Sequence, residues 1–362
     1  MRVAFRVDAS AKIGIGHVMR SLTLANALLS SGASSMFICR SLPEYLRSLI
    51  LKNGHTVQLL PPSSGVHKHD VNECRWLDVS TDTDASETIA YLEGRNWDWI
   101  VIDHYGIEFA WEKSVYPFCE KLIVIDDLAN RHHHCDILLD QTLSRQAEDY
   151  TDLVPRDCRL LMGAQYALLR SEFSELREYS LSLRKEPVVR RLLISLGGTD
   201  LKNVTTKVLQ LLSKAGLLKG ISTRVVLGSG STTLKSVKLL VSKIDEDIEL
   251  LIDIENMAEI ISLSDLVIGA AGTSSWERCC LGAPTIMLVL ADNQKLIAQA
   301  IEEAGAAISL GSPDQQGFGK KLKSAFAQIR AGNNLIQMSR KAALITNGNG
   351  VSAVSELMTL TA

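Results

Sequence analysis

The sequence lacks several features that would assign it at once to a class of protein. Its 362 residues contain no dense run of Lys or Arg and carry a formal net charge of −3. The sequence therefore predicts no basic surface that would bind nucleic acid or an anionic membrane. Apolar runs such as 285–291 are far shorter than the roughly 20 residues of a membrane span. We therefore expect neither nucleic-acid binding nor membrane insertion.

Cysteine is also sparse and irregularly spaced. The seven cysteines are odd in number and include no Cys-x-x-Cys pair, which argues against a disulfide framework. The first residues, Met-Arg-Val-Ala-Phe-Arg-Val-Asp, are interrupted by charge too early for the apolar core of a signal peptide. These two observations predict a reducing, cytoplasmic location.

Short β-branched runs alternate with longer segments of helical periodicity. Between the first two runs, residues 17–30 have a helical apolar stripe, and Gly32 is a plausible stop. Strands that are apolar throughout and separated by helices predict a parallel sheet covered on both faces. In the first half, the expected strands are Val3–Val7, Ser35–Cys39, Thr56–Leu59, Trp99–Ile102, Leu122–Ile125 and Ile137–Leu139.

The same pattern starts again after a polar, proline-containing segment, Arg184-Lys-Glu-Pro187. It predicts an α/β fold with two doubly wound, Rossmann-like domains, 1–183 and 184–362, an interdomain cleft, and a last helix that crosses back to the first domain. Residues 61–86 are polar and are expected to form a loop excursion with a short helix. The expected strands of the second half are Arg191–Ser195, Thr223–Leu227, Ile248–Leu251, Leu266–Ile268, Pro284–Val289 and Ala307–Leu310.

The first candidate site is the turn Gly14-Ile-Gly-His17, directly after the first strand. Its glycines permit close approach of backbone to a ligand, and the following helix N-terminus favours anions. A dinucleotide fingerprint would place a third glycine where Met19 stands, and no Walker lysine is present. Arg40, at the end of the second strand, leaves a minor alternative in which it meets the 2′-phosphate of NADP.

His17 itself admits two interpretations. The positive end of the helix dipole would favour a neutral imidazole, which is the form that a general base requires. Alternatively, His17 only caps or packs at the turn. The stretch Asp103-His-Tyr-Gly106 follows another buried strand, so His104 and Tyr105 could face a ligand, or Asp103 could only tie down the loop.

In the second half, a buried strand runs into Gly272, Thr273 and Ser274 at the mouth of a helix. Their amides and hydroxyls would suit a pyrophosphate, and Glu277 could accept hydrogen bonds from a ribose. Ser274 and Glu277 also fit a capping box, and both interpretations can hold together. The polar group 292–294 follows another strand and could bind sugar hydroxyls or form an ordinary turn.

Two clusters suggest metal or redox chemistry only superficially. Adjacent side chains in His132–His134 cannot all point at one ion, and no second ligand set has suitable spacing. Cys279 and Cys280 would diverge by about 100° on a helix. We expect no metal site, and we expect two packed thiols rather than a redox pair.

Together these motifs resemble those of a known family, the PseG hydrolases of pseudaminic acid biosynthesis. The resemblance rests on sequence blocks that occur in the same order over essentially the whole chain. The family has the GT-B fold, similar to the glycosyltransferase MurG, and hydrolyses UDP-2,4-diacetamido-2,4,6-trideoxy-β-L-altropyranose. The blocks lie at 6–10, 14–20, 102–106, 125–128, 135–140, 196–200 and 292–294.

The resemblance implies hydrolysis without metal or cofactor, in which water attacks C1, the C1–O bond breaks with inversion, and UDP leaves. His17 would be the general base or position the water, and Tyr105 and Asn293 would share the catalytic site. The UDP-sugar would be the only expected partner, and the sequence predicts no particular oligomeric state. The implied substrate-binding residues are Gly14, Gly16, Arg20, Gly197, Gly198, Met257, Gly272, Thr273, Ser274, Glu277 and Gln294.

Two other functions fit the same residues. A glycosyltransferase on this scaffold would use His17 to deprotonate an acceptor hydroxyl instead of water. A UDP-sugar sensor would bind the nucleotide without turnover. UDP is a good leaving group once its diphosphate is bound, so one base and an anion-binding turn would suffice for hydrolysis.

Overall fold

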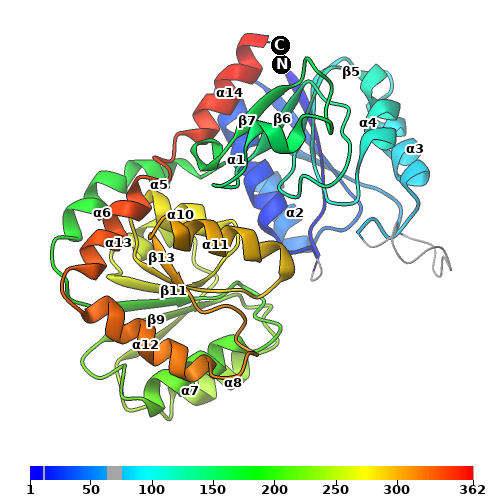
Figure 1. Ribbon diagram of the computed structural model, residues 1–362. Helices are drawn as coiled ribbons and strands as arrows, with labels where there is room; N and C mark the ends of the chain where they lie inside the picture. Colours follow the sequence, from blue (N-terminus) through cyan, green and yellow to red (C-terminus); the bar gives the residue numbers. More distant parts are fainter. Residues whose placement is uncertain (11–12, 63–75, 362) are drawn as a thin grey trace. The chain divides into compact units, whose positions relative to one another are not determined.

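The computed structural model describes residues 1–10, 13–62 and 76–361. The chain divides into two compact units, the first formed by Met1–Leu169 with Asn349–Ala362 and the second by Arg170–Gly348. Each unit is a parallel sheet with helices packed on its faces (Figure 1). Half of the expected excursion over 61–86, residues 63–75, lies outside the described residues, and its last six residues form the start of helix α3.

The sheet of unit 1 has seven parallel strands in the order β3-β2-β1-β4-β5-β6-β7. The order reverses between β1 and β4, as in doubly wound folds, and ligands bind beside such a reversal. The six expected strands are confirmed; the edge strand β7 was missed because it is short and only one of its four residues is fully buried. The elements are β1 (Arg2–Val7), α1 (Gly16–Ser30), β2 (Ser34–Cys39), α2 (Glu44–Lys52), β3 (Thr56–Leu59), α3 (Thr81–Leu92), β4 (Trp97–Asp103), α4 (Phe109–Val115), β5 (Cys119–Ile125), β6 (Ile137–Asp140), β7 (Arg159–Met162) and α14 (Gly350–Thr361).

Successive side chains of each strand enter different cores. Phe5 packs with α1, α2 and α14 on one face of the sheet, whereas Ala4 packs with α3 and α4 on the other. Both faces are thus covered, which is why the central strands have apolar residues at successive positions and not only at every second one.

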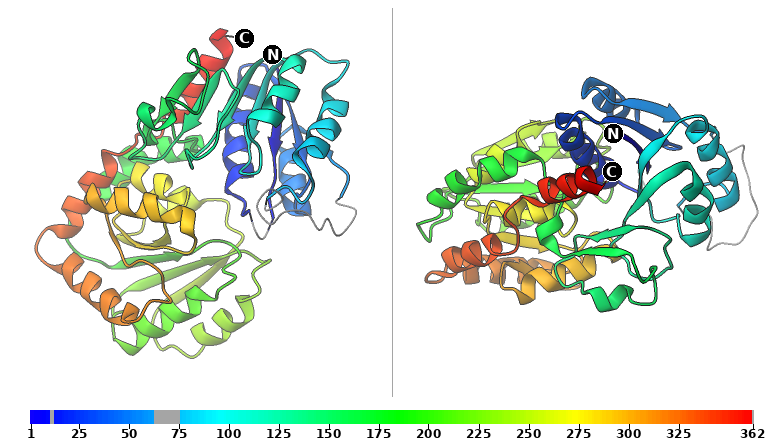
Figure 2. Two further views of the ribbon diagram at one scale, coloured as in Figure 1. Left: turned by 45° about the vertical axis from the view of Figure 1, so that its right-hand side comes forward. Right: turned by 90° about the horizontal axis from the view of Figure 1, so that it is seen from above.

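The last helix, α14, completes unit 1. Val351, Val354 and Met358 join the core that α1 also covers, and the Trp99 indole donates to the Met358 carbonyl at 3.1 Å. Figure 2 shows this red helix beside the blue α1, with both chain termini at the same end of the unit. Residues from the two ends of the sequence therefore form one core.

Unit 2 repeats the plan with six parallel strands in the order β10-β9-β8-β11-β12-β13. All six expected strands are present, and their apolar side chains pack against α7, α12 and α13. Among the described residues, no helix is both long and apolar enough to cross a membrane. The elements are α5 (Ser171–Glu175), α6 (Arg177–Leu183), β8 (Arg191–Ser195), α7 (Val204–Lys214), β9 (Ser222–Leu227), α8 (Leu234–Val241), β10 (Ile248–Ile252), α9 (Met257–Ser262), β11 (Leu266–Ala270), α10 (Ser274–Cys280), β12 (Thr285–Leu288), α11 (Lys295–Glu303), β13 (Ala307–Ser309), α12 (Phe318–Arg330) and α13 (Asn334–Ala343).

The division of the chain differs from the expected boundary between residues 183 and 184. Helices α5 and α6 belong to unit 2, because Arg177 donates to the Ala343 carbonyl at 2.6 Å and Ser180 to the Leu281 carbonyl at 2.8 Å. The polar segment 184–187 is a loop of unit 2 and not the linker. Composition marked a loop there, but the side chains that tie α6 down lie far apart in sequence.

At Gly350, helix α14 packs closely against the backbone of the rest of unit 1. A Cβ at this position would lie 2.5 Å from the carbonyl oxygen of Ala167, against backbone that cannot move aside easily. We expect Gly350→Ala to lower the free energy of unfolding of unit 1 by about 1–3 kcal/mol. Urea unfolding measures the effect, and Ser352→Ala, on the exposed side of the same helix, is the control. Equal midpoints for the two variants would contradict the close packing.

Candidate active site

The site of unit 1 lies where β1, β4 and β5 end. Helix α1 starts shortly after β1 and brings His17 to this edge, while Asp103 is the last residue of β4 and pairs in register with Val7 of β1. Gly14 takes a positive φ of 85° and its amide donates to the Ser10 carbonyl at 2.8 Å. The turn therefore needs a glycine, and it delivers the helix N-terminus to the strand ends.

His17 and Asp103 form a buried pair. The imidazole Nδ1 contacts Asp103 Oδ1, and the two side chains are 8% and 0% exposed. A carboxylate can only accept hydrogen bonds, so the neutral imidazole holds its proton on Nδ1 and keeps the lone pair on Nε2. An orienting carboxylate behind a histidine is the arrangement that catalytic bases use. Asp103, considered above only as a residue that ties down its loop, thus directs His17.

Arg20, one turn further along α1, holds the other side of Asp103. Its Nε lies 2.6 Å from Asp103 Oδ2 and its Nη2 lies 2.5 Å from Oδ1. Burial alone would raise the pKa of Asp103, but the charge of Arg20 and the hydrogen bonds from Arg20 and His17 outweigh it and hold that pKa well below its usual range. Arg20 was expected to bind substrate; the structure instead gives its guanidinium internal partners, since its side chain is 4% exposed.

Tyr105 and Asp127 complete this group. The Tyr105 hydroxyl donates to Asp127 Oδ2 at 3.2 Å, and Arg20 Nη1 lies 3.5 Å from the same oxygen. The Tyr105 ring meets the His17 ring edge to face, with 4.6 Å between centroids. The structure therefore brings together two predicted catalytic residues, His17 and Tyr105, and adds Asp127, which the sequence analysis did not single out.

The remaining residues of the 103–106 motif have structural roles. The Gly106 amide donates to His104 Nδ1 at 3.0 Å, so Nε2 carries the proton and faces Asp8 Oδ2 at 3.2 Å. Burial lowers the pKa of His104 despite the nearby Asp8 carboxylate. A Cβ on Gly106 would lie 2.9 Å from Leu77, so only glycine fits without displacing that side chain.

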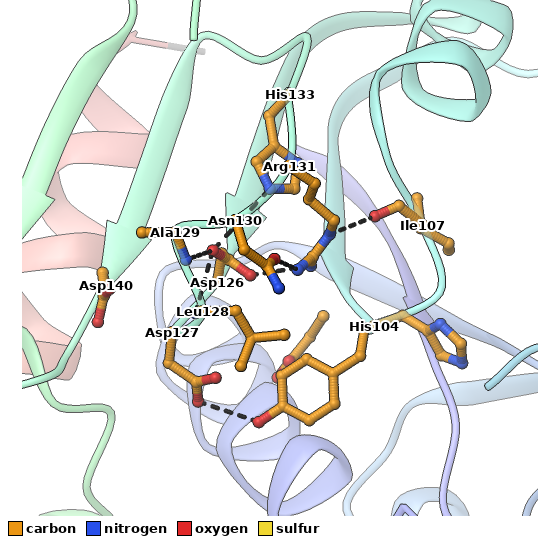
Figure 3. A network of polar contacts seen from close by, with 12 residues as sticks. His104, Ile107, Asp126, Asp127, Leu128, Ala129, Asn130, Arg131, His133 and Asp140 are labelled. Carbon is orange, nitrogen blue, oxygen red and sulfur yellow. Dashed lines mark hydrogen bonds and ion pairs between the residues drawn. The ribbon is translucent and has the colours of Figure 1, made fainter. Parts of the chain in front are cut away.

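In the loop after β5, the two adjacent aspartates Asp126 and Asp127 have different contacts. Asp126 Oδ2 accepts from the Ala129 amide at 2.9 Å and from the Tyr150 hydroxyl at 2.8 Å, and Arg131 lies 2.8 Å from Oδ1. In Figure 3, Asp126 reaches toward Ala129 and Arg131, whereas Asp127 points away from them. Asp126 therefore fixes the loop, and Asp127 is left to face the site.

The histidines of 132–134 point to different partners. His133 Nδ1 lies 2.7 Å from Glu112 Oε1, and both side chains are fully buried. The His134 ring packs edge-on against Tyr116 and Phe109, with centroids 4.8 and 5.5 Å away. Within the described residues, no group of three His, Cys, Asp or Glu side chains could hold a metal ion.

Arg40 is also committed within unit 1. Its guanidinium lies 2.9 Å from Asp84 and 2.6 Å from Glu87, and it donates to the Pro61 carbonyl at 2.7 Å. Each of these groups would compete with a 2′-phosphate for the same N–H donors. The NADP alternative for this residue is therefore not supported.

In unit 2, several predicted binding residues gather at the carboxyl edge of the sheet. Gly197 and Gly198 follow β8, and the Gly198 carbonyl accepts from the Gly228 amide at 2.9 Å. Gly272 follows β11, and a Cβ on it would lie 3.6 Å from the amide nitrogen of Gln294. The Gln294 side chain is anchored because it accepts from the Leu290 amide at 2.9 Å.

The turn into α10 differs from the expected capping box. Thr273 is the N-cap residue, and no side chain caps the helix. The Ser274 hydroxyl instead accepts from Arg278 Nη1 at 2.9 Å, and Arg278 Nη2 donates to the Ala270 carbonyl at 2.7 Å. A Cβ on Gly269 would lie 2.8 Å from Arg278, so this glycine makes room for the guanidinium. Burial lowers the pKa of Arg278 to about 10.

The other predicted residues of unit 2 lie on the same loops or helix starts. Glu277 is partly buried on α10, and burial raises its pKa even though Arg170 opposes the shift. Met257 begins α9, and Asn293 lies exposed in the short 3-10 helix Asp292–Gln294. The catalytic residues expected from the resemblance are therefore divided, with His17 and Tyr105 in unit 1 and Asn293 in unit 2.

These two Rossmann-like units define an α/β protein of the GT-B type. The solved structure of MurG from Acinetobacter baumannii matches with a TM-score of 0.67 and 14% identity, covering 99% of each chain. Residues 193–357 match the model of the glycosyltransferase family 28 C-terminal domain. That span begins in β8 and ends within α14.

Among individual proteins, the chain is similar to the UDP-2,4-diacetamido-2,4,6-trideoxy-β-L-altropyranose hydrolase of Campylobacter jejuni. The two are 28% identical over 305 residues, which cover 84% of this chain and 97% of the relative. The spore coat polysaccharide biosynthesis protein SpsG of Bacillus subtilis is 23% identical, over 86% of this chain and 84% of its own length. The resemblance inferred from the motifs is thus confirmed.

The depressed pKa of Asp103 makes a prediction about stability and pH. An unfolded aspartate titrates near pH ~4, so the folded unit gains stability from the ionised form above that pH and loses it as the pH falls towards the lower folded-state pKa. We expect Asp103→Asn to cost about 3–5 kcal/mol of unfolding free energy at pH 7. The difference from wild type should shrink between about pH 5 and pH 3.

Urea unfolding at several pH values measures this dependence. Asp152→Asn, which changes an exposed aspartate of the same unit, is the matched control and should leave the curve unchanged. A constant difference between Asp103→Asn and wild type across the whole range would mean that the ionised carboxylate is not what stabilises the site.

Proposed function

We propose that this protein hydrolyses a UDP-sugar, UDP-2,4-diacetamido-2,4,6-trideoxy-β-L-altropyranose, to UDP and the free sugar, as a cytoplasmic step of pseudaminic acid biosynthesis. The observation that carries the proposal is the buried Asp103–His17 pair, because it leaves an oriented basic nitrogen at the carboxyl edge of a Rossmann-like sheet. The similarity to the C. jejuni hydrolase over most of both chains supports the choice of substrate.

In the proposed reaction, a water oxygen bonds to C1 of the sugar while the bond from C1 to the diphosphate oxygen breaks. His17 Nε2 takes one proton from the water, and UDP leaves with the electron pair of the broken bond. Attack opposite the leaving group inverts the configuration at C1. Because a bound diphosphate is a stable leaving group, the proposed step needs neither a second carboxylic acid nor a metal ion.

The residues of unit 2 are assigned to the nucleotide half of the substrate. Gly272, Thr273 and Ser274 precede the first hydrogen bonds of α10, so their amides suit the diphosphate. Glu277 is assigned to the ribose hydroxyls and Met257 to the uracil side. Gly14, Gly16 and Tyr105 of unit 1, together with Asn293 and Gln294, are assigned to the sugar and the attacking water.

A glycosyltransferase remains the second candidate, because residues 193–357 match a glycosyltransferase domain. In that case His17 would take a proton from an acceptor hydroxyl, and the same oriented base would be needed. The two functions differ in whether UDP is released when water is the only acceptor.

We expect purified protein to release UDP from the proposed substrate in buffer with EDTA and without any acceptor. In ¹⁸O-labelled water the label should enter the sugar at C1 and not the UDP, because the C1–O bond is the one that breaks. Mass spectrometry of both products measures this, and early NMR spectra report the anomer formed. Binding of the UDP-sugar without UDP release would overturn the hydrolase assignment and favour the transferase.

The two halves of the site should respond differently to substitution. We expect His17→Ala to lower kcat by about 10²–10⁴-fold with little change in UDP affinity, since it removes the base. Glu277→Gln should weaken UDP binding and raise KM while kcat falls much less. Steady-state kinetics and calorimetric titration with UDP separate these effects. Normal turnover by His17→Ala would remove His17 from the mechanism.

A further inference from the structure

Asp127 is a second carboxylate in the site, and it has no role in the reaction proposed above. Its side chain is 15% exposed, and its Oδ2 lies within reach of both the Tyr105 hydroxyl, at 3.2 Å, and Arg20 Nη1, at 3.5 Å. The other oxygen, Oδ1, is buried without a hydrogen-bond partner among the described residues. Oδ1 is thus shielded from solvent, and Oδ2 is the oxygen through which Asp127 contacts Tyr105 and Arg20.

The pairing with Asp127 decides which way the Tyr105 hydroxyl points. A carboxylate has no proton to donate, so the hydroxyl must give its single proton to Asp127 Oδ2. The phenol oxygen can then act toward any other group only as an acceptor. His17 Nε2, whose proton stays on Nδ1 beside Asp103, is an acceptor as well.

Two acceptors carried by side chains in contact suit one particular ligand, a water molecule with two protons to donate. The edge-to-face contact of the Tyr105 and His17 rings, with centroids 4.6 Å apart, places these acceptors on neighbouring side chains. A water that donates both of its protons presents its lone pairs away from them, which is the orientation that a nucleophile requires.

From this geometry we propose that Asp127 is a positioning residue that makes Tyr105 a hydrogen-bond acceptor for the attacking water. The inference rests on the proposed hydrolysis and assigns Asp127 a part in it. Without the carboxylate, Asp127 no longer draws the Tyr105 proton to its side, and a proton turned toward the water would oppose the orientation set by His17. Asp126, although adjacent, cannot replace Asp127, because its oxygens bind the Ala129 amide, Tyr150 and Arg131.

A double-mutant cycle of Asp127→Asn and Tyr105→Phe tests the inference on the full chain with the UDP-sugar as substrate. Each single variant should lower kcat by about 10- to 100-fold, the loss expected for one hydrogen bond that involves a charged group. KM should change by less than about threefold, since the substrate itself keeps its contacts. In the Tyr105→Phe background, adding Asp127→Asn should cost less than about twofold more.

The chain offers a matched control in another Tyr–Asp pair of unit 1. The Tyr116 hydroxyl donates to Asp136 at 3.1 Å, next to the amino end of β6 and so at the opposite edge of the sheet. Asp136→Asn makes the same change of a carboxylate to an amide in such a pair and should leave kcat unchanged. A loss of kcat in Asp136→Asn equal to that in Asp127→Asn would show a general effect on folding and would overturn the positioning role.

The remaining outcomes separate the inference from the function on which it rests. If the wild-type protein releases no UDP, the proposed function fails before any variant is compared. If the wild type hydrolyses the substrate but the two substitutions add fully in the cycle, Asp127 does not act through Tyr105 and the inference is wrong. If Asp127→Asn does not fold, Tyr105→Phe alone tests the inference. Normal kcat in that variant would show that the attacking water does not need the Tyr105 oxygen as an acceptor.

Discussion

The carboxylate of Asp103 is the interaction on which the site depends. It stands at the end of a central strand and is held on one side by the guanidinium of Arg20 and on the other by the imidazole of His17. Both partners come from a single helix, three residues apart, so they lie on one face of it. The start of α1 is therefore fixed to the end of β4 by charge as well as by apolar packing, and the orientation of the imidazole follows from this attachment.

The same edge of the sheet carries a second layer of buried charge. Arg6 on β1 lies 2.7 Å from Asp84 of α3 and 2.9 Å from Asp8, and Asp8 in turn accepts from the Arg40 amide at 2.6 Å. Buried charges of this kind cost desolvation energy and are tolerated when each is paired. In unit 1 they connect the helices of one sheet face to the loops that carry the site. Arg6 and Asp8 lie in the first of the sequence blocks that resemble a known family.

The sequence predicted the parts of this protein that depend on local pattern. Apolar runs in the sequence predicted twelve of the thirteen strands of the two sheets. The position of His17 after Gly14-Ile-Gly16 indicated a candidate base at the start of a helix. It could not distinguish Asp126 from Asp127, because their roles depend on how the loop closes around the Ala129 amide. It also missed Arg278, whose space exists only because Gly269 on another element has no side chain. Such features arise from contacts between distant segments, which no spacing rule describes.

The position of α14 has a consequence for how the chain folds as it is synthesised. Unit 2 is one continuous segment, 170–348, and all of its strands leave the ribosome before residue 349 does. Unit 1 must wait, because Val351, Val354 and Met358 fill its core and are made after the whole of unit 2. Until then, the surface of α1 and β4 that they cover is apolar and exposed. Synthesis of unit 1 thus starts before that of unit 2 but its folding is completed after it, and over that interval unit 1 exposes apolar surface that favours aggregation.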